Sequence, residues 1–121
     1  MILTMSMVRE GDLEISGDHT VTQRVTGSIT VNPGSSLVLM GVAEGGVVVR
    51  GGGLARIAGT TNGLFVAIGG HAVLTGTCIG SVTNDGGDLT IDGVVTCDLI
   101  EHAGTTRVAP GAIIHHGRLP A

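Results

Sequence analysis

Large aromatic side chains are almost absent from this chain. Its 121 residues include no tryptophan, no tyrosine and a single phenylalanine, Phe65. Globular cores usually depend on large aromatics, so we expect a narrow interior filled by aliphatic side chains. Nucleic-acid binding is not expected either, because the chain lacks stacking aromatics and its six basic residues, all arginines, face ten acids for a net charge of −4.

Proline and charge are also scarce. Three prolines, and glycines that do not recur at every third position, exclude a collagen helix. Only 13% of the residues are charged while 42% are hydrophobic, with a mean hydropathy of +0.47, which excludes a disordered chain. Glycine is abundant instead, with 22 residues. Helices do not tolerate glycine at this frequency, so strands are expected.

Cysteine is too rare to form a disulfide framework. Cys78 and Cys97 lie about one repeat apart, and we interpret them as thiols on neighbouring turns, with a disulfide or metal-binding pair as the alternative. The apolar segment Met1–Val8 is too short for a membrane span and has no basic leader. The sequence therefore predicts a cytoplasmic protein, with membrane contact only through Met1–Val8.

The glycines punctuate a repeat. Residues 29–41, 47–59 and 64–76 each read as two apolar-x-apolar runs joined by a glycine corner and closed by glycine. The closing glycines are Gly41, Gly59 and Gly76. A fourth line closes at Gly93 if one corner residue is deleted, and a degenerate fifth line follows through 99–104. Self-similarity at such a fixed period indicates a repeat architecture, and its short period favours a solenoid.

The alternating runs predict short strands, which cannot bury an apolar face alone. Stacking successive lines about 4.8 Å apart solves this problem and places position 31 over 49 and then 66. We therefore predict an all-β, single-stranded, right-handed parallel β-helix (β-solenoid). Its section is triangular, with about 17–18 residues per coil and about five to six coils. The third and least regular side is expected at 42–45, 60–63 and 77–79.

A single domain spans 1–121 in this interpretation. It comprises an N-terminal cap or apolar arm at 1–10, coils at 11–114 and a polar C-terminal cap at 115–121. A left-handed hexapeptide helix is the competing solenoid, because residues 79–84 would pass for one of its repeats. Strict six-residue recurrence fails elsewhere, which favours the right-handed form.

The alternation directs one set of apolar side chains outward. Phe65 follows Val48 on the adjacent turn, and three further apolar residues lie on a neighbouring side. Together they form a candidate protein-contact patch: Val38, Met40, Val48, Phe65 and Val73. The alternative is that Phe65 is out of register and fills a wide part of the interior.

A run of acids near the C-terminal end contains no base. Its members are Asp85, Asp88, Asp92, Asp98 and Glu101. Such a run is usually a solvated face. The alternative is an acidic docking patch that meets a basic protein partner.

No constellation of catalytic residues is present. The histidines are scattered, and adjacent His115 and His116 diverge on an extended strand, so no metal site is expected. No serine lies in a Gly-x-Ser-x-Gly elbow, and Gly51–Gly53 lacks the lysine that a phosphate loop requires. The sequence therefore predicts a non-enzyme with no catalytic, cofactor-binding or metal residues and no cofactor.

The lines at 27–41, 45–59, 62–76 and 80–93 resemble the core of the bactofilins, bacterial cytoskeletal proteins. The resemblance implies a triangular right-handed β-helix that polymerises end to end without nucleotide, and therefore a self-assembling structural scaffold. Bactofilins usually carry disordered tails, whereas this sequence stops at Ala121 soon after the repeats. The alternative function is a small acidic protein-binding module, such as an immunity protein that neutralises a toxin.

Overall fold

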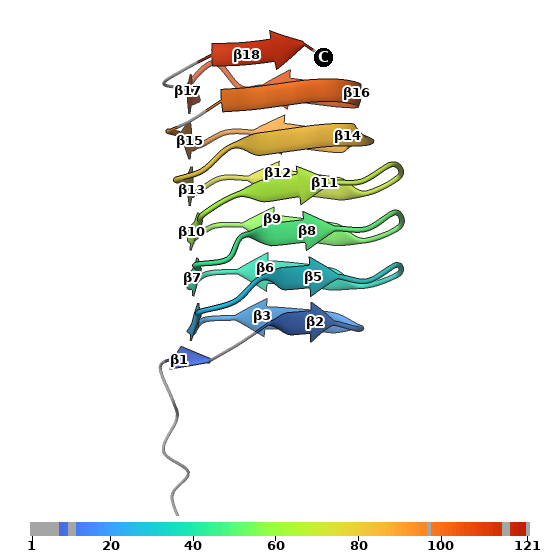
Figure 1. Ribbon diagram of the computed structural model, residues 1–121, viewed down its shortest axis with the longest axis vertical. Helices are drawn as coiled ribbons and strands as arrows, with labels where there is room; N and C mark the ends of the chain where they lie inside the picture. The colour runs from blue at the N-terminus through green and yellow to red at the C-terminus, as the bar shows by residue number, and fades with distance from the viewer. Residues whose placement is uncertain (1–7, 10–11, 97, 115–116, 121) are drawn as a thin grey trace, which may run out of the picture.

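The computed structural model describes residues 8–9, 12–96, 98–114 and 117–120. Within them the chain is all β and forms a parallel β-solenoid of about six turns (Figure 1). In this view the near strands run to the right and the far strands to the left while the chain climbs, which is a right-handed winding. The predicted fold class is confirmed.

Each turn contributes one strand to each of three faces. The first face is made of β2 (Leu13–Ile15), β5 (Ile29–Val31), β8 (Val47–Val49), β11 (Leu64–Val66), the beginnings of β14 (Val82–Ile91) and β16 (Asp98–Val108), and β18 (Gly117–Pro120). The second face is made of β3 (Asp18–Val21), β6 (Ser36–Leu39), β9 (Leu54–Ile57), β12 (His71–Leu74) and the ends of β14 and β16. The third face is made of β1 (Val8–Arg9), β4 (Arg24–Val25), β7 (Val42–Ala43), β10 (Thr60–Thr61), β13 (Thr77–Cys78), β15 (Val94–Val95) and β17 (Ile113–Ile114).

The register follows the repeat. Val31 pairs with Val49, and Val49 pairs with Val66, as predicted. The deleted corner residue of the fourth line is also confirmed. Val66 pairs with Asn84 at an offset of 18, whereas His71 pairs with Asp88 at an offset of 17, so the corner between them is one residue shorter.

The core is a narrow column of aliphatic side chains. Its largest fully buried members include Ile15, Ile29, Leu37, Leu39, Ile57, Leu74, Leu89, Ile91 and Leu99. Alternation explains the burial, since β8 and β11 each bury their first and last residues and turn the middle one outward. Phe65 is not among the buried residues, so this core contains no aromatic ring and is filled by aliphatic side chains, as the sequence predicts.

The glycine corners are of two kinds. Between the first and second faces, Gly34, Gly52 and Gly69 have φ values of 77°, 83° and 82°, a region that side-chain-bearing residues rarely adopt. Between the second and third faces the constraint is steric. A Cβ on Gly59 would overlap the carbonyl oxygen of Gly41 on the turn below.

Strand pairing extends past the expected coil boundaries. β1 pairs with β4, and β18 pairs with β16, so the ladder runs from Val8 to Pro120. Residues 1–7 of the expected arm, and His115–His116 of the expected cap, lie outside the described residues. In the described part of the chain no strand lies beneath β2 or β3, which end the sheet path.

Candidate interaction surfaces

The outer side of the first face carries the chain's single aromatic ring. Phe65 pairs with Val48 below and with Thr83 above, as the predicted column requires. Its residue surface is 38% exposed, so it points outward and the alternative of an interior Phe65 is wrong. Val48 and Thr83 are half-buried. The face therefore presents a small apolar surface at the middle of the solenoid.

A hollow lies beside this apolar surface. Its volume is about 220 Å³, and it is lined by Val48, Phe65 and Thr83 together with Gly46 and Gly63. The two glycines occupy the same column of the first face and carry no side chain, so the sheet is lower there. The Phe65 ring thus projects next to a depression in its own face. We call the Phe65 ring the knob and this depression the hollow.

The predicted five-residue patch is divided between faces. Val38 and Val73 lie outward on the second face and are half-buried, but Arg56 pairs with both and separates them. Met40 is 59% exposed and directly follows β6, at the edge of that face. Of the five residues, only Val48 and Phe65 are paired with each other on adjacent turns.

The acidic run does not gather into one patch. Asp85 and Glu101 lie near the corner that ends the first face, and Asp88 begins the second-face part of β14. Asp92 follows the end of β14, and Asp98 begins β16. The five acids are spread around the perimeter of the fifth and sixth turns because each turn carries its residues through all three faces.

The acids also have basic neighbours that the sequence does not reveal. Nδ1 of His71 lies 3.2 Å from a carboxylate oxygen of Asp88 on the next turn, and both side chains are more than half exposed. Arg107, one turn above Thr90, lines a small hollow with Asp88. Charges distant in sequence are therefore interleaved on the second face.

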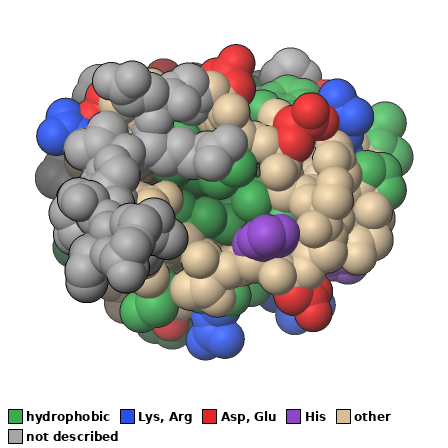
Figure 2. Space-filling model, turned by 90° about the horizontal axis from the view of Figure 1, so that it is seen from below, with side chains coloured by type: hydrophobic (Ala, Val, Ile, Leu, Met, Phe, Trp, Pro, Cys, Tyr) green, Lys and Arg blue, Asp and Glu red, His purple; other side chains and the backbone are tan. Residues whose placement is uncertain are grey.

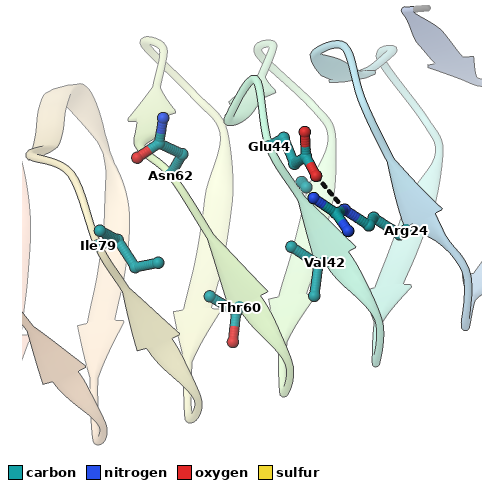
Figure 3. A pocket seen from close by; sticks show the side chains of 7 residues that line it. Arg24, Val42, Glu44, Thr60, Asn62 and Ile79 are labelled. Atoms are coloured by element: carbon teal, nitrogen blue, oxygen red, sulfur yellow. Dashed lines mark hydrogen bonds and ion pairs between the residues drawn. The ribbon is translucent and has the colours of Figure 1, made fainter. Parts of the chain in front are cut away.

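A depression of about 500 Å³, open to solvent, lies on the third face. Figure 3 shows Arg24 and Glu44 joined by an ion pair at one end and Ile79 at the other. Between them lie Val42 and Thr60, which stack in register on adjacent turns. The lining combines apolar side chains with polar ones, and its one carboxylate, that of Glu44, forms an ion pair with Arg24.

The N-terminal end of the solenoid is apolar at its centre. Figure 2 views the molecule from below and shows hydrophobic side chains in the middle of this end, with histidine, acidic and other polar groups beside them. Leu13, Ile15 and Val21 belong to this first turn. His19 takes the inward position in register with Leu37 and is exposed, because in the described part of the chain no strand lies beneath β3.

Metal-ligand clusters and membrane-spanning helices are absent from the described residues. Among them no group of three or more histidine, cysteine or acidic side chains is placed to hold a metal ion. No helix there is long and apolar enough to cross a membrane. Cys78 is buried and pairs with Val95 on the next turn, while Cys97 lies outside the described residues.

Compared with known protein families, curated proteins and solved structures, the chain shows no match.

Proposed function

We propose that the protein is a non-catalytic structural solenoid that self-assembles by stacking copies end to end, the role implied by its resemblance to the bactofilins. The observation that carries this proposal is the open first turn. Within the described residues, β2 and β3 end the sheet path, and the apolar centre of the same end is visible in Figure 2. An unpaired strand edge recruits another strand unless it is covered.

The hydrogen-bond pattern identifies which backbone amides of β3 point away from the solenoid at its N-terminal end. On the second face, the amide of Ser36 donates to the carbonyl of Gly17 at 3.0 Å, and the amide of Leu54 donates to the carbonyl of Ser35 at 2.9 Å. Residues whose side chains face solvent therefore donate their amide hydrogen to the turn below. By the same alternation the amides of Asp18 and Thr20 in β3 point away from the solenoid. They are donors for a strand of another copy.

Stacking the first turn of one copy on the last turn of another is a heterologous contact. Such contacts produce open filaments when the rotation does not close a ring. The ladder spacing would continue across the junction at about 4.8 Å. The proposal thus predicts rods of uniform width whose length rises with protein concentration.

The test is Thr20→Pro, with Thr20→Val as the matched control. Proline removes the outward-pointing amide of the edge strand and is tolerated at sheet edges, whereas valine keeps that amide and occurs at the same column as Val38. Electron microscopy and sedimentation velocity should reveal filaments for the parent and for Thr20→Val, and short species for Thr20→Pro. Circular dichroism checks that all three are folded.

A parent chain that remains monomeric at high concentration would contradict the proposal. So would filaments of equal length in Thr20→Pro and Thr20→Val. The alternative of an acidic protein-binding module has less support, because the five acids are divided among the three corners of the solenoid and His71 lies against Asp88.

A further inference from the structure

We propose that two copies pair side by side through their first faces, in antiparallel orientation, with Val48 and Phe65 at the centre of the contact. This lateral pairing does not depend on the end-to-end stacking proposed above. Three observations carry it: an outward-facing apolar residue, a hollow beside it, and two opposite charges placed symmetrically about it.

The knob and the hollow suit a contact between two identical faces. Phe65 projects from the fourth turn, and the hollow of about 220 Å³ formed over Gly46 and Gly63 lies directly beside it. When two such faces meet, the lowered glycine column leaves space for each ring to lie down between the sheets. Burial of these exposed apolar atoms favours association.

Two opposite charges flank the knob on one margin of the face. Val49, Val66 and Asn84 lie on three successive turns, so the residues that follow them, Arg50, Ala67 and Asp85, form the next column. Arg50 is one turn below Phe65 and Asp85 is one turn above. Ala67 separates them, and neither forms an ion pair among the described residues.

This placement selects one symmetry. A two-fold axis that runs along the strands through the turn of Phe65 exchanges the turns above and below it. Arg50 of each copy then faces Asp85 of the other, the two copies run antiparallel, and the two Phe65 rings meet at the axis, where offset stacking is favourable. Packed sheets lie about 10 Å apart, a gap that an arginine and an aspartate side chain together can span.

The parallel arrangement lacks this complementarity. A two-fold axis along the solenoid reverses the strand direction and keeps each turn at its own height. It would therefore place Arg50 opposite the glycine column of the other copy, with no carboxylate to meet it. The charges thus distinguish the antiparallel pair from the parallel one.

The face is too small for a tight dimer. With turns about 4.8 Å apart and a rise of about 3.3 Å per residue, it offers roughly 500 Å² per copy. The total of roughly 1,000 Å² lies below the range of stable complexes. The pairing is therefore weak between single copies and becomes effective between assemblies that present many faces at once.

The experiment is a charge exchange measured by sedimentation velocity from about 10 µM to about 1 mM. The Thr20→Pro background removes end-to-end stacking. There, Arg50→Asp and Asp85→Arg should each weaken dimerisation about tenfold, because each places like charges opposite one another twice. The double variant should restore the dissociation constant to within about threefold of its Thr20→Pro parent. Arg56→Asp on the second face is the control and should leave it unchanged.

A mixing measurement keeps the proposal testable if Thr20→Pro fails to fold. In the otherwise unaltered chain, Arg50→Asp and Asp85→Arg should each pair poorly with themselves, yet pair with each other when mixed, since every contact then joins opposite charges. Absence of dimer at the highest concentration in the end-blocked protein, failure of the double variant to restore pairing, or failure of the mixture to associate would overturn the proposal. End-to-end stacking is tested separately, by comparing the length of the assemblies that the parent chain and the Thr20→Pro variant form.

Discussion

At the scale of single residues, glycine meets two different demands in this solenoid. The sequence predicts glycine corners, but it does not tell whether positive φ or close backbone approach requires the glycine at a given corner. The distinction depends on the neighbouring turn, since the carbonyl that excludes a Cβ at Gly59 belongs to Gly41 on the turn before it. Gly52, by contrast, has space for a Cβ but a φ of 83°.

The steric demand makes Gly59→Ala strongly destabilising. The added methyl group would force apart two hydrogen-bonded turns, so we expect a loss of about 2–4 kcal/mol in the free energy of unfolding. Gly111→Ala is the matched control, because nothing lies within 4 Å of its Cβ position. It should change stability by less than about 0.5 kcal/mol. Urea unfolding followed by circular dichroism measures both, and equal losses would refute the steric explanation.

At the scale of elements, β14 differs from the strands below it because it runs through the corner without a break. Asn84 explains this continuity. It takes the inward position that Val66 has on the turn below, and its polar side chain is fully buried. Its Nδ2 donates to the carbonyls of Gly87 and Thr105, each at 3.0 Å, and to Oγ1 of Thr106 at 2.9 Å. Its Oδ1 accepts from the amide of Gly87 at 2.9 Å. The side chain thus replaces the missing corner residue.

Replacing Asn84 should therefore open the corner. Asn84→Val restores the residue type of the column but leaves several buried backbone groups without partners, so we expect a loss of about 2–4 kcal/mol in the free energy of unfolding. Asn62→Val, at an exposed position of the third face, is the control and should change little. Thermal and urea unfolding measure the difference. A stable Asn84→Val protein would show that the network does not hold the corner.

The elements also show where sequence reasoning succeeds. The spacing between repeats suffices to place Val31, Val49 and Val66 in one column and to direct Phe65 outward, because stacking is set by the repeat alone. The shortened corner is visible in the sequence, but the role of Asn84 is not, since its partners Thr105 and Thr106 belong to the next turn.

Surface clusters are harder to predict than columns. A contiguous acidic run looks like one patch, yet each turn distributes its residues over three faces and brings His71 against Asp88. The apolar set is divided as well, because Arg56 lies between Val38 and Val73 on the intervening turn, an arrangement that the repeat spacing already predicts.

At the scale of the whole molecule, the two ends differ. The inward column of Ile15, Val31, Val49 and Val66 is aliphatic from the first turn upward and becomes polar at Asn84. In a solenoid each turn contacts only its neighbours, so stability is a sum over adjacent turns and the end turns fray first. Among the described residues, the first turn combines an apolar centre with strands that end the sheet path, so added contacts are expected to stabilise this end most.

Hydrogen exchange of the first turn, measured by mass spectrometry at low and at high protein concentration, tests end-to-end assembly most directly. We predict that amides of the peptide covering Asp18–Val21 become protected as concentration rises, while those of the central strands β8 and β9 are protected throughout. The Thr20→Pro variant should lose the concentration dependence. Exchange at Asp18–Val21 that is the same at every concentration in the parent protein would contradict the account.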